Sequence, residues 1–312
     1  MEVLSLGIFV ADVLAKPITK MPKRGRLELI DRVELHTGGC ANNTGIGLAR
    51  LGISTGVMGK VGKDGFGDFI LQKLRSEGVD TRGMKRDEKE NTSFTFVMIA
   101  PDGERSFFHY IGTNARLSLD DIDLDIVKKV KILHIAGSNL MPGFDGKPTA
   151  RLLKKAKDFG VTTSLDTAWN STIDWFKTME PSLPFIDIFL PSIEEAKMIT
   201  GKKEPEDIAG FLLSHGVKIV GLKMGTKGSY IATKGERHFI PTFKVKTVDA
   251  TGAGDAFVAG FLTGIVKGWD IKRCGLLGNA VGACCVQAIG CTQGIKSFNE
   301  TIKFLKGGNG RL

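Results

Sequence analysis

Residues 249–255 read Asp-Ala-Thr-Gly-Ala-Gly-Asp, and residues 256–262 continue as Ala-Phe-Val-Ala-Gly-Phe-Leu. The second stretch has the composition of a buried apolar helix, so the glycine-rich turn lies at a helix N-terminus. Small residues there leave several backbone N–H groups without partners, and with the helix dipole these groups form an anion site. Asp255 lies in the first turn, where a carboxylate either caps the helix or takes a proton from an attacking hydroxyl. The fragment predicts an anion site and leaves both roles of Asp255 open.

A second glycine-rich segment, residues 38–45, reads Gly-Gly-Cys-Ala-Asn-Asn-Thr-Gly and opens a predicted helix. Its glycines let the backbone approach a ligand closely, and Asn43 offers a hydrogen-bond donor and acceptors. Asp12 follows the first predicted strand, and ligands of open parallel sheets bind beyond the carboxyl ends of strands. The structural alternatives are an ordinary first-turn residue for Asn43 and a turn former for Asp12.

Short apolar runs alternate with amphipathic helices along most of the chain. Strands are predicted at residues 3–9, 56–61, 132–136, 162–165, 186–190 and 219–223, and helices at residues 41–51, 66–77, 149–159, 193–200 and 207–214. Continuous apolar strands between helices indicate a mostly parallel sheet that is covered on both faces. From about residue 255 onward the pattern is nearly all helix.

Two regions interrupt this alternation. Residues 27–34 alternate apolar and charged side chains, as a half-exposed strand does. Residues 93–99 and 105–111 flank Pro-Asp-Gly-Glu at 101–104, which is turn chemistry. We predict that these segments form a small antiparallel sheet beside the main one. At an open α/β edge, such a sheet acts as a lid.

The composition limits the functional class. The chain has 312 residues, 42% of them hydrophobic and 25% charged, and a net charge of +9, which excludes disorder and collagen-like repeats. The basic residues are scattered and are not interleaved with aromatic residues, so we expect no nucleic-acid partner. The five cysteines include no Cys-x-x-Cys, which predicts neither a zinc site nor a disulfide framework.

The uncharged stretch at residues 274–295 is long enough to span a bilayer. It contains Asn279, Gln287, Gln293 and five glycines, so we predict a buried helix followed by a loop instead. No basic leader precedes an apolar region at the N-terminus. We therefore expect a cytoplasmic protein without a membrane partner.

Several signatures of other enzyme classes are missing. The sequence holds no P-loop and no Gly-x-Ser-x-Gly. The pair Gly252 and Gly254 lacks the third glycine of a dinucleotide fingerprint, which disfavours a nicotinamide dehydrogenase. The five histidines form no ligand-spaced pair, and His109, in the predicted lid, is the one that we keep as a substrate contact.

Taken in order, residues 38–52, 59–67 and 249–260 resemble the signatures of the ribokinase-like, or PfkB, carbohydrate kinases. The resemblance extends over essentially the whole chain. It implies an α/β fold, a three-layer sandwich with a mostly parallel central sheet and a small β-sheet lid.

The resemblance also implies a domain organisation. Residues 1–312 would form a single kinase domain, with lid strands inserted at about residues 14–36 and 91–112. Exposed strand edges in such a lid invite pairing between two copies of the chain. We therefore expect a homodimer through the lid.

Members of this family transfer the γ-phosphoryl group of ATP to a hydroxyl group, usually on a sugar or a nucleoside. The resemblance implies that Asp255 is the general base and that the backbone amides of Gly252, Ala253 and Gly254 form the anion hole. This agrees with the reading of the segment itself, because phosphoryl transfer depends on positioning and charge stabilisation. The implied cofactors are ATP and Mg²⁺.

Further contacts follow from the same resemblance. The implied contacts are Asp12, Gly39 and Asn43 for sugar hydroxyls, and Lys223, Gly225, Gly228 and Asn279 for the nucleotide. For Asn279, a buried amide bonded to the backbone is the alternative. Glu195 keeps the acidic position that orders Mg²⁺ through water, while Ser192 replaces the usual Asn. Asp249 and Thr251 match a region where some members bind K⁺, which makes K⁺ activation a hypothesis.

The substrate side is interpreted from residues near the strand ends. Cys40 and Ala41 stand where true ribokinases have Lys-Gly, which argues against ribose. Asn139 and Asp166 follow the predicted strands at residues 132–136 and 162–165 and are assigned to the substrate. Asn139 is neutral where sugar-specific members often have an acid.

Sugar acid kinases usually place a cation near the substrate carboxylate. Arg105 and Arg116 flank the predicted lid strand, and we expect them to point outward. We therefore predict a neutral sugar or a nucleoside as substrate. The alternatives are a nucleoside kinase of the same fold and a catalytically silent regulator that binds sugar or nucleotide.

Overall fold

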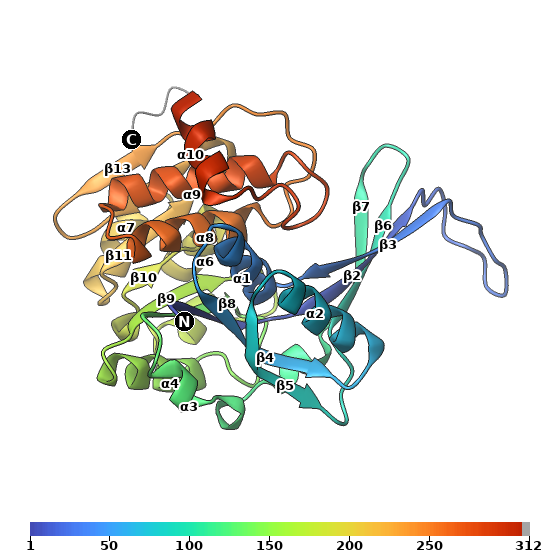
Figure 1. The fold of residues 1–312 in the computed structure, drawn as a ribbon, viewed down its shortest axis with the longest axis horizontal. Coiled ribbons are helices and arrows are strands. Elements are labelled where there is room, and N and C mark those ends of the chain that lie inside the picture. The colour runs from blue at the N-terminus through green and yellow to red at the C-terminus, as the bar shows by residue number, and fades with distance from the viewer. Residues whose placement is uncertain (308–312) are drawn as a thin grey trace.

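The computed structural model describes residues 1–307. Within that range, nine strands form one large sheet in the order β13-β12-β11-β10-β9-β8-β1-β4-β5 (Figure 1). The strands are β1 (Val3–Gly7), β4 (Thr55–Gly62), β5 (Asp80–Asp87), β8 (Ile132–Ser138), β9 (Thr162–Thr167), β10 (Ile188–Phe189), β11 (Ile219–Lys223), β12 (Ser229–Ala232) and β13 (Arg237–Ile240). The pairs from β5 to β11 are parallel, and β12 and β13 add an antiparallel edge. The predicted mostly parallel sheet is confirmed.

Helices cover both faces of this sheet. One face carries α3 (Leu124–Val127), α4 (Lys147–Asp158), α5 (Trp175–Met179), α6 (Ile193–Thr200) and α7 (Pro205–Ser214), and the other carries α1 (Cys40–Arg50), α2 (Gly65–Ser76), α8 (Ala253–Val266), α9 (Ile271–Cys285) and α10 (Phe298–Gly307). Leu4 and Leu6 of β1 pack in the first layer, and Val3 packs in the second. Because the strands are buried on both faces, they read as continuous apolar runs. The result is the predicted three-layer sandwich.

A smaller sheet projects from this body (Figure 1). Its order is β3-β2-β6-β7, with β2 (Val10–Lys16), β3 (Arg32–Gly38), β6 (Phe94–Ile99) and β7 (Arg105–Tyr110). Two antiparallel hairpins, β2–β3 and β6–β7, join through a parallel β2–β6 pair. The predicted lid sheet is therefore present, although one of its three pairs is parallel.

The first lid hairpin differs from its prediction. The alternating residues 27–34 were expected to form a strand, but β3 begins only at Arg32. β2 starts at Val10, before the expected position, and pairs with β3 from Val10 opposite Gly38 to Lys16 opposite Arg32. Leu27 and Leu29 lie beyond the end of this ladder and are 77% and 89% exposed. Apolar alternation without a partner strand therefore did not produce a strand.

The fold brings several candidate residues to one edge of the large sheet. Asp166 lies near the end of β9, Lys223 ends β11, and Asn139 directly follows β8. Since parallel strands end at the same edge, these three residues lie at one edge of the sheet, where Lys223 borders the first turn of α8. No helix in the described part of the chain is long and apolar enough to cross a membrane. The uncharged stretch from residue 274 forms most of α9, up to Cys285, and then a loop, as predicted.

Candidate active site

The glycine-rich turn before α8 has the geometry of an anion hole. Gly252 is the N-cap of α8, with a left-handed φ of 78°, and no side chain caps the helix there. A Cβ at this position would lie 2.2 Å from the carbonyl oxygen of Cys291, so only glycine fits. Of the two roles that the sequence left open for Asp255, that of the helix cap is therefore not the one observed. Ala253 N donates to the Ala250 carbonyl at 3.3 Å, whereas the amides of Gly254 and Asp255 have no hydrogen-bond partner in the described part of the chain and remain available for an anion.

Asp255 is held by the other glycine-rich segment. Asn43 Nδ2 on α1 donates to Asp255 Oδ2 at 2.8 Å. Gly39, which precedes α1, has a φ of 92°, and a Cβ there would lie 2.5 Å from the carbonyl oxygen of Ile8. Burial raises the pKa of Asp255, while Asn43 and the charge of Lys223 oppose that rise. The carboxylate is thus fixed beside the anion hole in a setting that makes it more basic than usual.

A buried ion pair lies on the other side of the hole. Lys223 Nζ donates to Asp166 Oδ2, and the two side chains are 14% and 3% exposed. Burial alone would lower the pKa of Lys223, but the carboxylates of Asp166, Glu195 and Asp255 outweigh it and raise that pKa. A Cβ on Gly254 would lie 3.3 Å from Lys223 Nζ, so the ammonium group borders the first turn of α8. Asp166, predicted as a substrate contact, is bonded to this lysine.

Glu195 and Ser192 form the N-terminus of α6. Ser192 N donates to Glu195 Oε2 at 2.8 Å, and Glu195 N donates to Ser192 Oγ at 3.3 Å, which is a capping box. Thr167 Oγ1 also donates to Glu195 Oε2, at 3.1 Å. Within residues 1–307, Glu195 Oε1 makes no hydrogen bond, and no cluster of three metal-ligating side chains occurs. A single carboxylate oxygen fits Mg²⁺ that is held mainly by water and substrate phosphates.

The sugar side is lined by polar groups from the lid and the sheet edge. Asp12 follows the first strand in the chain but lies within β2 and not in a turn, and burial raises its pKa to about 6. A Cβ on Gly38, which pairs with Val10 in the β2–β3 ladder, would lie 2.1 Å from Asp12 Oδ2, so glycine at position 38 leaves room for the carboxylate. His109 Nδ1 lies 3.1 Å from Thr95 Oγ1, and Thr95 on β6 pairs with Asp12 on β2. These lid residues therefore lie together.

Asn139 is the most unusual polar residue at this edge. Its φ is 85°, the one positive value at a non-glycine position within residues 1–307. Its side chain is buried, and neither Oδ1 nor Nδ2 has a partner in the described part of the chain. The backbone is held at both ends, by Asp145 Oδ1 on its N–H at 2.9 Å and by Asn170 Nδ2 on its carbonyl at 2.8 Å. An unpartnered buried amide on a fixed, strained backbone is suited to bind a ligand.

A cavity of about 580 Å³ extends from the anion hole toward α9. Its walls include Lys223, Gly225, Gly228, Ala253, Gly254 and Asn279, together with Thr226, Phe243, Thr247 and Phe257. Gly228 has a φ of 98°, and a Cβ there would lie 2.0 Å from the carbonyl oxygen of Ile240. Asn279 Nδ2 donates to the carbonyls of Ile240 and Pro241 at 2.9 and 3.3 Å. This is the alternative considered for Asn279, a buried amide bonded to the backbone. The volume suits a ligand of nucleotide size.

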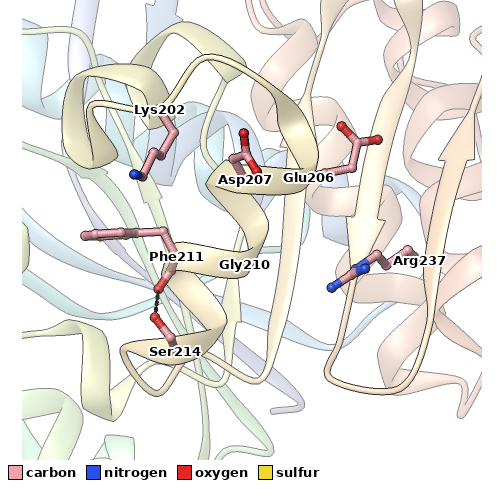
Figure 2. Close-up of a pocket in the computed structure, with 7 residues that line it drawn as sticks. All are labelled: Lys202, Glu206, Asp207, Gly210, Phe211, Ser214 and Arg237. Carbon is pink, nitrogen blue, oxygen red and sulfur yellow. Dashed lines mark hydrogen bonds between the residues drawn. The ribbon is translucent and has the colours of Figure 1, made fainter.

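A second concavity of similar volume lies on α7 and β13 (Figure 2). It is lined by Lys202, Glu206, Asp207, Gly210, Phe211, Ser214 and Arg237. Ser214 Oγ donates to the Phe211 carbonyl at 2.7 Å, and the acidic side chains are accompanied by Lys202 and Arg237 (Figure 2). No residue predicted for catalysis or binding lines it, so the phosphoryl chemistry is not located there.

Asp249 and Thr251 have a partner that the sequence did not indicate. Arg105 Nη1, from β7 of the lid, donates to Asp249 Oδ1 at 3.0 Å and to Thr251 Oγ1 at 2.8 Å. Arg105 was expected to point outward, and that expectation is wrong. No local pattern signals this contact, because the partners are 144 and 146 positions apart in the sequence.

Comparisons with known proteins agree with this geometry. The model of the pfkB family of carbohydrate kinases matches residues 2–297. The 2-dehydro-3-deoxygluconokinase of Bacillus subtilis is 31% identical over 293 residues, which cover 90% of each chain. The 5-dehydro-2-deoxygluconokinase of Clostridium beijerinckii is 32% identical over 286 residues, 87% of this chain and 84% of that protein.

Solved structures show the same fold. A provisionally named ribokinase II from Escherichia coli, crystallised with ATP and Mg²⁺, superposes with a TM-score of 0.86 and 26% identity. The superposition covers 98% of this chain and 99% of that one. The anion hole, the adjacent carboxylate and the neighbouring cavity thus occur in a chain that, by sequence and by fold, belongs to the pfkB family of carbohydrate kinases.

Proposed function

We propose that this protein transfers the γ-phosphoryl group of ATP to a hydroxyl group of a neutral sugar, with Asp255 as general base. The observation that carries the proposal is the position of Asp255, which Asn43 fixes at 2.8 Å beside the open N-terminus of α8. A base and an anion site at one point are what phosphoryl transfer to a hydroxyl requires. The bound ATP and Mg²⁺ of the E. coli ribokinase II support the choice of phosphoryl donor.

In this mechanism the chain moves one proton. The substrate hydroxyl lies between Asp255 and the γ-phosphoryl group, and Asp255 accepts the hydroxyl proton as the oxygen attacks phosphorus. Burial, which raises the pKa of Asp255, makes it a stronger base than an exposed aspartate. Asn43 keeps the carboxylate in place and leaves its second oxygen for the substrate.

Negative charge on the transferred group is stabilised by the amides of Gly252, Ala253 and Gly254 and by Lys223. The amides lie at the N-terminus of α8, so the helix dipole adds to their hydrogen bonds. Lys223 remains protonated because three carboxylates surround it, and Asp166 holds its ammonium group. We assign two roles to Asp166: it orients Lys223, and it contacts the substrate. Glu195 would hold Mg²⁺ through water, and the metal supplies charge neutralisation at the phosphates when bound.

The nucleotide is proposed to occupy the cavity lined by Gly225, Gly228 and Asn279. Phe257, Phe243 and Ala283 give the cavity an apolar wall for a base. The Nδ2 atom of Asn279 is committed to backbone carbonyls. Asn279 therefore shapes the wall and presents only its carbonyl oxygen to the nucleotide.

A neutral sugar is favoured by the charges around the substrate side. The groups proposed to bind it are Asp12, Gly39, Asn43, His109 and Asn139. Two cations of the site region are already paired, Lys223 with Asp166 and Arg105 with Asp249. A substrate carboxylate would lie near Asp12 without a free cation to balance it. The two relatives named for dehydro-deoxygluconates make sugar acids the necessary comparison.

We also infer that residues 1–312 act as one kinase domain that dimerises through the lid. β3 and β7 are the two edge strands of the small sheet. Val33 on β3 and Phe107 and Phe108 on β7 are each more than half exposed. Apolar side chains on open strand edges favour pairing with a second copy. Light scattering of the wild type and of Phe107→Asp tests this, with a monomeric wild type contradicting it.

The decisive experiment is a coupled ADP-release assay with ATP and Mg²⁺, with Asp255→Asn as the blank. The acceptors are ketohexoses, aldoses, sugar acids, sugar phosphates and nucleosides. One strong neutral sugar that is silent with the variant supports the proposal. A preference for a sugar acid or a nucleoside contradicts the assigned substrate class. Silence with all acceptors, while ATP binds, favours a regulatory protein. We expect the enzyme to work in the cytoplasm, where ATP is present and its five free cysteines stay reduced.

A further inference from the structure

Arg105 joins the lid to the segment that carries the anion hole. It begins β7 opposite Ile99, next to the turn of the β6–β7 hairpin (Figure 1). Its side chain leaves the small sheet and contacts both Asp249 and Thr251 through Nη1, at 3.0 and 2.8 Å. Among the hydrogen bonds of residues 1–307, these two are the only ones between β7 and residues 249–255. The Arg105 side chain is 29% exposed, whereas the Asp249 side chain is 3% exposed.

Asp249 is the point where three segments meet. Its Oδ1 also accepts from Thr251 N at 2.9 Å, and its Oδ2 accepts from Gly290 N at 2.9 Å. Burial alone would raise the pKa of Asp249, but the hydrogen bonds from Arg105, Gly290 and Thr251 outweigh it and hold that pKa at about 2. Asp249 is therefore a buried anion whose counter-charge comes from the lid.

This arrangement does not fit a K⁺ ion on Asp249 and Thr251. A K⁺ site replaces the hydration shell of the ion with oxygen atoms that face it. Here both carboxylate oxygens of Asp249 accept N–H groups, and the Thr251 hydroxyl faces the guanidinium group. The positive charge that faces Asp249 and Thr251 is the guanidinium group of Arg105.

We propose that Arg105 is a positioning residue of the phosphoryl-transfer site. From the lid, it supplies the positive charge beside Asp249 and Thr251 that the family resemblance assigned to K⁺. By holding Asp249 and Thr251, it orders the turn that leads into Gly252 and ties that turn to the lid hairpin. The proposal rests on the proposed kinase function. It has two consequences: turnover does not depend on K⁺, and the lid hairpin and the turn before α8 lose order together when Arg105 is removed.

Amide hydrogen exchange tests the second consequence without any substrate. The full-length protein is compared with Arg105→Met, with Arg116→Met as the matched control, because Arg116 is exposed and follows the same hairpin. We expect Arg105→Met to increase exchange in peptides that cover residues 99–110 and 249–255, and the control to leave both unchanged. Unchanged exchange at residues 249–255 in Arg105→Met would overturn the proposal.

Steady-state kinetics test the first consequence. Rates of the wild type are measured in Na⁺, K⁺ and tetramethylammonium chloride at equal ionic strength, and equal rates are expected. We expect Arg105→Met to lower kcat by about tenfold or more, since the anion hole is misplaced while sugar contacts remain, with KM for the sugar little changed. Arg105→Lys should retain part of the rate, and K⁺ or methylguanidinium should restore part of it to Arg105→Met.

Failures of the two proposals are distinguishable. A wild-type rate that rises several-fold in K⁺ overturns the role of Arg105 and leaves the kinase function intact. Absence of turnover with every acceptor contradicts the kinase function, and the exchange experiment then decides by itself whether Arg105 orders the turn.

Discussion

Asn43 and Asp255 lie 212 positions apart in the sequence, and the amide Nδ2 of the first donates to the carboxylate Oδ2 of the second at 2.8 Å. The bond joins the first turns of α1 and α8, the two helices that follow glycine-rich segments. Each helix starts at a glycine with positive φ, Gly39 and Gly252, so both chain paths depend on the absence of a Cβ. The two segments with the strongest sequence signals thus meet at a single carboxylate.

Replacing the carboxylate tests its role directly. Asp255→Asn keeps the size and one hydrogen-bond partner of the side chain but removes its basicity. We expect kcat to fall by about 10²- to 10⁴-fold, the usual contribution of a general base. Binding of a non-hydrolysable ATP analogue, measured by calorimetry, should stay near the wild-type value. Near-normal turnover by Asp255→Asn would show that another group takes the proton.

Removing the amide that holds Asp255 should change the pH profile. Asn43 opposes the rise in the pKa of Asp255 that burial causes, so Asn43→Leu raises that pKa further. A base works only when deprotonated, and activity is therefore lost as pH falls through its pKa. The acid limb of kcat/KM should move to higher pH in Asn43→Leu. A lower rate with an unmoved acid limb would assign Asn43 to substrate binding alone.

Much of the main sheet could be predicted because its strands are buried on both faces. α6 and β11 begin and end at the predicted residues, and α1 and α2 start one residue early. β5, β12 and β13 were not predicted. β5 and β13 are the edge strands and have exposed positions, whereas β12 is buried throughout but has only four residues. A strand is visible in a sequence when it is both long enough and continuously buried, and each of these three strands lacks at least one of the two properties.

The site was predictable where the chemistry is local and unpredictable where it depends on distant partners. The turn around Gly252 and the base Asp255 lie in one short segment. The pairing of Asp166 with Lys223 and of Arg105 with Asp249 joins residues from different elements, and no spacing encodes it. The positive φ of Asn139 also comes from tertiary contacts, with Asp145 and Asn170. The sequence therefore predicted which residues belong to the site, but not which side chains they contact.

Lys223 is expected to act mainly on phosphate charge. Lys223→Met removes a protonated ammonium group beside Gly254 and leaves Asp166 buried without its partner. We expect kcat/KM for ATP to fall by about 10²- to 10³-fold, the effect of losing one charge-stabilising donor. Lys227→Met is the matched control, since Lys227 is exposed in the same loop, and it should leave the rate unchanged. Equal losses in both variants would contradict a specific role for Lys223.

The buried carboxylate of Asp12 should lower the free energy of unfolding while it contributes to sugar binding. Burial raises its pKa from 3.8 to about 6, so at pH 7 the charged form is less stable in the folded chain than in the unfolded chain. A shift of about two pKa units corresponds to about 3 kcal/mol, an upper value for this partly exposed side chain. Asp12→Asn should therefore increase the free energy of unfolding at pH 7 while raising KM for the sugar.

The sign of the pH dependence distinguishes this cause from a simple packing gain. Because the folded pKa is above the unfolded one, the destabilising effect of Asp12 is present above about pH 6 and disappears as pH falls below about 4. Urea unfolding at pH 7 and at pH 4 should therefore show a stabilised Asp12→Asn at the first pH and no difference from wild type at the second. Asp31→Asn, at an exposed position, serves as the control and should match wild type at both. A stability gain of equal size at both pH values would mean that the charge of Asp12 is not its cause.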